Sequence, residues 1–213
     1  MRPWLALTHA GAKFETDTAK LESFATTTLA ERRQLGSVAG LFPILRIDGT
    51  PIHESLAIGE TVAELFPAAG LWPEPFTDRA LARALCAEMV SDFAAIRNEM
   101  PCHLFGRAPA FQPSEQARKN IDRVFEIWSG CLERSGGPFL FGRASLADFF
   151  YFPVLTRFRT YGVALESRAL DYAEALEALP AVRALIDAAR TAPAMALYDD
   201  YIVKHGGNPD AAL

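Results

Sequence analysis

Cysteine, basic charge and long apolar runs are all scarce in this sequence. Its 213 residues include three cysteines, Cys86, Cys102 and Cys131, which are too few and too scattered for a disulfide framework or a Cys-x-x-Cys redox motif. Lys and Arg together number 21, against 26 Asp and Glu. This deficit of cations argues against nucleic acid as a partner, because binding phosphates needs a surplus of cations on some face. No apolar run reaches the length of a membrane span, so we expect no membrane partner either.

Secretion signals and metal motifs are also missing from the pattern. The first residues lack the basic, apolar and small-residue sections of a signal peptide, and we therefore expect a cytoplasmic protein. His9 and His53 stand singly, without metal-ligand spacing, so we expect no metal. Cys102 is followed by His103. This pair leaves a His-assisted thiolate as an alternative, although adjacent residues of a helix rarely point at each other.

The composition that remains is that of a chain with a real core, since 50% of its residues are hydrophobic and 22% are charged. The first part, residues 1–66, alternates short elements. The pattern predicts a helix over 3–10 with Gly11 at its C-terminal cap, a strand over 13–17, and a polar helix or loop over 19–35. It then predicts a hairpin of strands 44–47 and 51–53 around an Asp-Gly turn, and an amphipathic helix over 54–66.

The rest of the chain has a different pattern. Residues 67–77 are rich in proline and hold Trp72, so they are typical of a linker with an aromatic anchor. Residues 78–213 are expected to be all-helical, with helices over 78–100, 114–134, 145–161, 170–179, 181–190 and 193–201. The sequence thus predicts an α+β N-terminal domain, a linker, and an all-α C-terminal domain.

Several stretches together resemble the glutathione transferase superfamily. They are RPWLALTHAG at 2–11, GLFPILRIDGTPIHESLAIGE at 40–60, Ser145-x-x-Asp148, and LEALPAVRALIDAARTAPA at 176–194. The resemblance covers nearly the whole chain. It implies a thioredoxin-like fold for residues 1–66, with glutathione as co-substrate, and it is strongest to bacterial transferases that use a catalytic hydroxyl before the first helix.

The resemblance also implies a glutathione site in the stretch 40–60. Phe42-Pro43 would be a cis peptide whose backbone pairs with the cysteinyl unit. Ser55, at a helix N-terminus, would bind the γ-glutamyl carboxylate, because free N–H groups and the helix dipole favour an anion there. Glu54 would pair with the α-amino group. Each residue also has an ordinary interpretation: a turn proline, a helix cap and a first-turn acid.

Two departures from the family pattern affect activity. The first strand and the catalytic Ser, Tyr or Cys of the family would lie before Met1, so we expect the natural protein to begin upstream. Leu41 stands where related transferases often have Lys or Arg. Arg33 or Gln34 are candidates to replace that cation or polar contact.

Two further sets of residues are candidates because of their positions on the predicted helices. Met89, Phe93, Arg97 and Met100 would share one face of the helix over 78–100, and the resemblance places a substrate pocket there. Such a stripe is also typical of core packing. Ser145 and Asp148 form a capping box with a structural role.

The functional reading that follows is conjugation of the glutathione thiolate to small electrophilic, apolar substrates by a homodimer. Two alternatives stay open. One is a non-catalytic binding or dimerisation module on the same fold, which the missing hydroxyl and Leu41 favour. The other is a glutathione-dependent isomerase or dehalogenase.

Overall fold

A computed structural model describes residues 1–18 and 27–211. The described elements of the N-terminal part are α1 (Arg2–His9), α2 (Leu29–Gln34), β1 (Ile44–Ile47), β2 (Thr50–His53) and α3 (Ser55–Leu65). Gly11 follows α1 with φ +69°, in the left-handed region that glycine adopts freely. Thr28 and Glu31 form a capping box at the start of α2. Half of the stretch predicted as helix or loop, residues 19–26, lies outside the described residues.

The hairpin is built as its sequence predicts. β1 and β2 pair antiparallel, with Ile44 opposite His53 and Ile47 opposite Thr50. The turn residues Asp48 and Gly49 both have positive φ, which suits a two-residue hairpin turn. The described sheet has these two strands alone. The predicted strand over residues 13–17 is wrong, because these residues are irregular and no described strand pairs with them to complete a ladder.

The linker is held against both parts of the chain. It contains a short 3₁₀ helix, η1 (Pro67–Ala69). The buried Trp72 donates its indole N–H to Glu60 of α3, at 3.0 Å. The backbone N–H of Leu146, at the start of helix α7 (Leu146–Thr160), donates to the carbonyl of Leu71 at 2.9 Å. The linker therefore ties the N-terminal part to the helical part.

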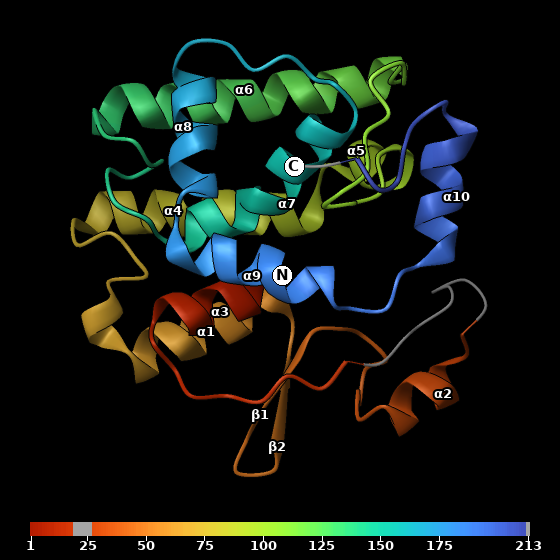
Figure 1. Ribbon diagram of the computed structural model, residues 1–213. Helices are drawn as coiled ribbons and strands as arrows, with labels where there is room; N and C mark the ends of the chain where they lie inside the picture. Colours follow the sequence, from red (N-terminus) through yellow and green to blue (C-terminus); the bar gives the residue numbers. More distant parts are fainter. Residues whose placement is uncertain (19–26, 212–213) are drawn as a thin grey trace.

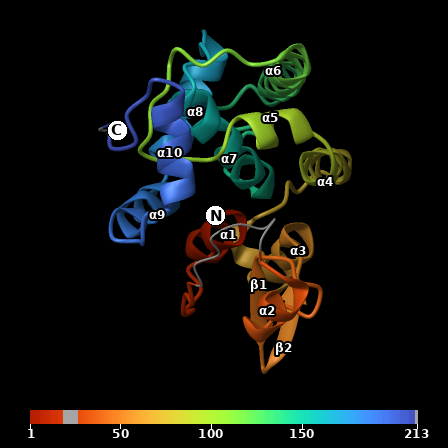
Figure 2. The ribbon, with the colours of Figure 1, turned by 90° about the vertical axis from the view of Figure 1, so that its right-hand side faces the viewer.

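The C-terminal part is all-helical, as predicted. Its helices are α4 (Phe76–Ser91), α5 (Ala94–Glu99), α6 (Glu115–Ser135), α7 (Leu146–Thr160), α8 (Arg168–Glu177), α9 (Pro180–Arg190) and α10 (Ala196–Lys204). Almost every residue of α7 is buried, and this helix runs through the middle of the helical part (Figures 1 and 2). The N-terminal part lies below it in Figure 1, and α1 packs against α3, α7 and α9. The last residues are also held, because Arg107 and Asn208 exchange two backbone hydrogen bonds of 2.8 Å.

The prediction of one helix over 78–100 is wrong. Helix α4 ends at Ser91, Asp92 is extended, and Phe93 takes a left-handed conformation with φ +58° before α5 begins. The Ser91 hydroxyl donates to the Asp92 carboxylate at 2.8 Å. The same hydroxyl also lies 3.1 Å from the carbonyl of Ala87, four residues earlier. A serine that bonds back along the helix in this way weakens and bends it, which fits a break that apolar periodicity does not reveal.

Candidate functional site

The turn before β1 has the backbone geometry that the resemblance implies. The Phe42–Pro43 peptide bond is cis. The buried Ser37 supports this turn, since its hydroxyl donates to the carbonyl of Leu41 at 2.6 Å. The side chain of Leu41 is 53% exposed. Arg33, a candidate replacement for the missing cation, donates to the carbonyl of Val38 at 3.1 Å. That contact leaves Arg33 bound within its own loop.

The start of α3 differs from expectation in one respect. Glu54 is the N-terminal cap of the helix, with φ +79°. Its carboxylate accepts hydrogen bonds from the backbone N–H groups of Leu56 at 2.9 Å and Ala57 at 3.3 Å. The hydroxyl of the buried Ser55 donates to the same carboxylate at 3.0 Å. The N–H groups that were expected to be free for a ligand carboxylate are therefore already occupied by Glu54.

The residues predicted to line a substrate pocket do not lie on one helix. Met89 belongs to α4 and Arg97 to α5, with the break at Phe93 between them. Met89, Phe93 and Met100 are buried in the core. Only Arg97 of this set is partly exposed. The structure thus favours the core-packing interpretation for the three apolar residues.

Sequence reasoning missed a cluster of three arginines, Arg2, Arg97 and Arg157, which we call the arginine cluster. Arg2 donates to the carbonyl of Phe150 at 3.1 Å. Arg157 donates to the carbonyl of Met100 at 2.7 Å and that of Pro153 at 2.9 Å. Burial, followed by the charges of Arg97 and Arg157, lowers the pKa of Arg2 to about 10. These residues belong to three helices far apart in the sequence, so no local pattern indicates that they meet.

The capping box at the start of α7 is present. Asp148 is fully buried and its carboxylate accepts hydrogen bonds from the backbone N–H groups of Leu140 at 3.0 Å and Ser145 at 2.8 Å. The hydroxyl of Ser145 donates to it at 2.9 Å. Burial raises the pKa of this carboxyl to about 6, and these hydrogen bonds oppose the shift. The residues hold the helix start and have no access to solvent for chemistry.

The cysteine and histidine side chains do not form a second reactive site. His103 lies 2.8 Å from the carboxylate of Asp199 through Nε2, and its Nδ1 accepts the backbone N–H of Gly106 at 2.8 Å. It is therefore not available to activate Cys102, whose sulfur lies 3.8 Å from the carbonyl of Pro153. Burial raises the pKa of both Cys86 and Cys131. The described residues contain no group of side chains with a metal-ligand arrangement.

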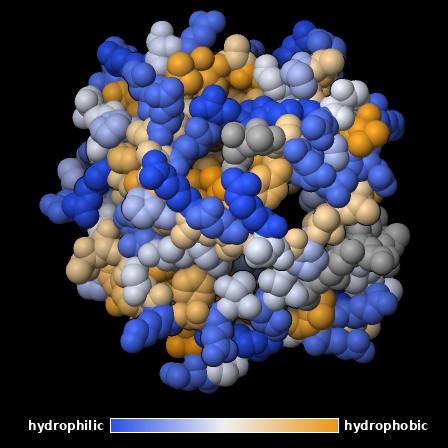
Figure 3. Space-filling view, viewed as in Figure 1, coloured by the Kyte–Doolittle hydropathy of each residue, from blue (hydrophilic) through white to orange (hydrophobic). Residues whose placement is uncertain are grey.

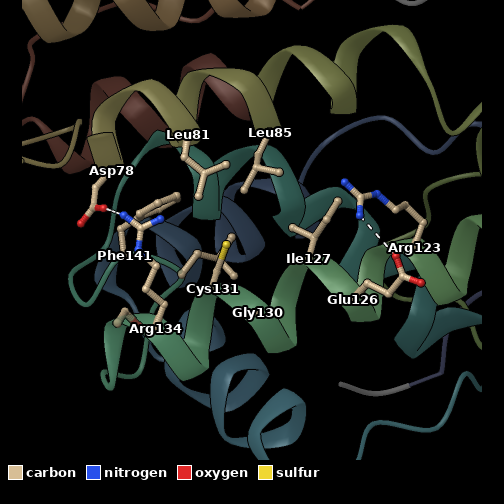
Figure 4. Close-up of a pocket in the computed structure, with 12 residues that line it drawn as sticks. Asp78, Leu81, Leu85, Arg123, Glu126, Ile127, Gly130, Cys131, Arg134 and Phe141 are labelled. Atoms are coloured by element: carbon tan, nitrogen blue, oxygen red, sulfur yellow. Dashed lines mark hydrogen bonds and ion pairs between the residues drawn. The ribbon is translucent and has the colours of Figure 1, made fainter. Parts of the chain in front are cut away.

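A shallow pocket lies between α4 and α6 (Figure 4). Its floor is apolar, with Leu81 and Leu85 on one side and Ile127 and Cys131 on the other. Ion pairs close its two ends, Asp78 with Arg134 and Arg123 with Glu126. No described group in it is a base or nucleophile poised for chemistry, since burial raises the pKa of the Cys131 thiol to about 11.

Across the described part of the chain, no helix combines the length and apolar character that crossing a membrane would require.

Comparison with known proteins agrees with this architecture. Residues 111–188 match the family model described as glutathione S-transferase, C-terminal domain. A glutathione transferase homolog from Burkholderia gl BGR1, solved with bound glutathione, is 25% identical, with a TM-score of 0.68 over 90% of this chain and 91% of that chain. No curated protein matches the sequence at a significant level.

Two more distant structures share the fold. BphK, a bacterial GST solved as a ternary complex, is 22% identical, with a TM-score of 0.63 over 88% of this chain and 92% of that chain. Glutathione transferase F2 from Populus trichocarpa is 16% identical, with a TM-score of 0.68 over 90% of this chain and 94% of that chain. Residues 111–188 thus match the glutathione S-transferase C-terminal domain, and the chain as a whole shares the two-part fold of these transferases.

Proposed function

We propose that the protein binds glutathione and transfers its thiolate to small electrophilic substrates. The observation that carries this proposal is the β1–β2 hairpin followed directly by Glu54 and Ser55 at the start of α3, the order of elements in the glutathione-binding segment that the sequence resembles. Support also comes from the Burkholderia homolog, whose structure contains glutathione. In such a reaction the protein lowers the pKa of the thiol and positions it against the electrophile.

Each residue of this segment has a proposed role. The Phe42–Pro43 segment would hold the backbone of the cysteinyl unit. Glu54 would accept the α-amino group, because its carboxylate is fixed by two backbone N–H groups and one hydroxyl and an ammonium adds a charge-assisted hydrogen bond. The Ser55 hydroxyl would turn from Glu54 to the γ-glutamyl carboxylate. Binding therefore exchanges one hydrogen bond of Ser55 for another.

Calorimetric titration of glutathione tests these roles. We expect saturable binding by the wild-type protein and roughly tenfold weaker binding by Ser55→Ala and Glu54→Gln, because each loses a hydrogen bond to a charged group. Ser114→Ala is the matched control, since Ser114 caps α6 by accepting the N–H of Ala117 at 3.1 Å. It should bind glutathione like the wild type. A folded wild-type protein that does not bind glutathione would refute the proposal.

A conjugation assay separates an active transferase from a binding module. With 1-chloro-2,4-dinitrobenzene as the electrophile, we expect glutathione-dependent product formation that Ser55→Ala reduces. Binding without turnover of this or other electrophiles would favour the non-catalytic alternative. Turnover of cis-enones or halogenated substrates alone would favour the isomerase or dehalogenase alternative.

We also propose that the protein is a cytoplasmic homodimer, as its resemblance to the superfamily implies. Sedimentation equilibrium tests the oligomeric state, with a mass of twice 23.3 kDa as the expected result. Fractionation of the source cells tests the location.

A further inference from the structure

The arginine cluster gathers positive charge where α1, α5 and α7 meet. Arg2 lies at the start of α1, Arg97 in α5 and Arg157 in α7. The three charges act on one another: Arg97 and Arg157 lower the pKa of Arg2, and Arg157 lowers that of Arg97, in each case after the larger effect of burial. Backbone carbonyls hold Arg2 and Arg157 in place, and the Arg2 guanidinium also lies 5.2 Å from the centre of the Phe150 ring.

The charge of the cluster is poorly neutralised. None of the ion pairs among the described residues includes Arg2, Arg97 or Arg157. Asp92 is the one described carboxylate whose charge acts on Arg97, and its effect is the smallest of the three on the pKa of Arg97. Asp92 is also exposed and hydrogen-bonded to Ser91. Three cations held together with so little compensation repel one another, and this repulsion is relieved when an anion binds.

Arg97 also has donor capacity to spare. Its Nη2 atom is buried and has no hydrogen-bond partner among the described residues. A guanidinium presents paired N–H groups that match the two oxygens of a carboxylate. The buried donor therefore lacks an acceptor that an anionic ligand would supply.

An anion has access to the cluster from solvent. The side chains of all three arginines are partly exposed. Figures 1 and 2 both place the first residue of the chain below α7 and close to α1 and α9, and Figure 3 shows the surface of this face. The site therefore lies at the junction of the N-terminal part with the helical part.

We propose that the arginine cluster binds the carboxylate of the second, electrophilic substrate, so that this protein selects anionic electrophiles. This inference rests on the proposed transferase function for the identity of the ligand. The glutathione segment proposed above lies just before β1 and at the start of α3, whereas the cluster lies on α1, α5 and α7. The two proposed sites therefore share no residue.

A binding experiment without glutathione tests the site itself. The probes are 4-methylbenzoate and 4-methylbenzamide, which have similar shapes and differ in charge. We expect the wild-type protein to bind the benzoate about tenfold more tightly in calorimetric titration, the effect of one charge-assisted hydrogen bond. Arg97→Met should remove this preference and Arg97→Lys should keep part of it. Arg183→Met, which removes an exposed cation of α9, should leave the preference unchanged.

The outcomes distinguish this inference from the proposed function. Equal affinity for the two probes, or a preference that Arg97→Met leaves intact in a protein folded by circular dichroism, would overturn the anion site even if glutathione binds. Displacement of the benzoate by glutathione but not by its glycine ethyl ester would assign the cluster to the peptide and overturn its role in selecting the electrophile. A charge preference in a protein that does not bind glutathione would support the anion site while refuting the transferase.

An assay of turnover then tests selectivity. With glutathione present, 4-(chloromethyl)benzoate should have a KM about tenfold lower than its methyl ester in the wild type. The two values should become equal in Arg97→Met. A KM ratio unchanged by this substitution would contradict the assignment.

Discussion

Replacing Asp148 by alanine should destabilise the protein more than any change at its capping partner. The Asp148 carboxylate is fully buried and accepts three hydrogen bonds, from the N–H of Leu140 and from the N–H and hydroxyl of Ser145. It therefore fixes the loop before α7 as well as the first turn of that helix. Because α7 runs through the core, a loss at this point affects the whole helical part.

The magnitude follows from the groups left without partners. Asp148→Ala leaves two buried backbone N–H groups unsatisfied, and each costs about 1–3 kcal/mol. The expected loss in unfolding free energy is about 2–6 kcal/mol. Ser145→Ala removes one hydroxyl donor and leaves both backbone bonds in place, so its loss should be about 1 kcal/mol.

Urea denaturation followed by far-UV circular dichroism measures these differences. Asp122→Ala is the matched control, since Asp122 is an exposed aspartate on α6, and it should change the unfolding free energy by less than about 0.5 kcal/mol. If Asp148→Ala costs no more than Ser145→Ala, the two backbone N–H groups find other acceptors and the reasoning fails.

Three further predictions concern pH and the junction between the two parts. Burial raises the pKa of Asp148 to about 6. Between pH 4 and pH 6 the folded protein therefore holds a proton on this carboxyl that the unfolded chain has released. Stability from this group therefore falls as pH rises through that window, and the unfolding free-energy difference between wild type and Asp148→Ala should shrink from pH 4 to pH 6.5; a constant difference would contradict this. Gly59→Ala should lower the free energy of unfolding by about 1 kcal/mol, because a Cβ there would lie 3.1 Å from a methyl of the buried Leu146 and overpacking outweighs the gain in helix propensity; a raised melting temperature would refute it. Glu60→Ala removes the bidentate pair with Arg83, at 2.5 and 3.1 Å, and also the acceptor of the Trp72 indole N–H at 3.0 Å, and should cost about 1–3 kcal/mol in urea denaturation because the pair is partly exposed and the indole is buried; an unchanged midpoint would show that neither contact contributes.

The sequence predicted those features that local chemistry determines. The Asp-Gly turn between two apolar stretches specified the hairpin, and Ser145 with Asp148 marked the start of α7. Both depend on residues within four positions of one another, so the pattern contains the necessary information. The break after Ser91 was missed, because the apolar spacing continues through Phe93 and hides the bond that Ser91 makes back to the carbonyl of Ala87.

The site residues show the same division. The position of Glu54 at the start of a helix was predictable, but its role as the cap was not, because an acid in the first turn and an acid at the cap have nearly the same sequence pattern. Whether the N–H groups of Leu56 and Ala57 are free depends on one rotamer of Glu54. A sequence specifies such a choice only through packing that has to be seen in the structure.

The arginine cluster is a product of the tertiary fold alone. In the sequence Arg2, Arg97 and Arg157 are unremarkable members of three helices, and the net charge of −5 gives no hint of a cationic site. They meet because α1 packs on α7 and because the break at Asp92 and Phe93 sets off the short helix α5, which carries Arg97. The break between α4 and α5 places Met89 and Arg97 on different helices, and the same break therefore helps to form the proposed anion site. If Arg97 continued the α4 helix, it would share a face with Met89, which is buried in the core, and its charge would need a partner there.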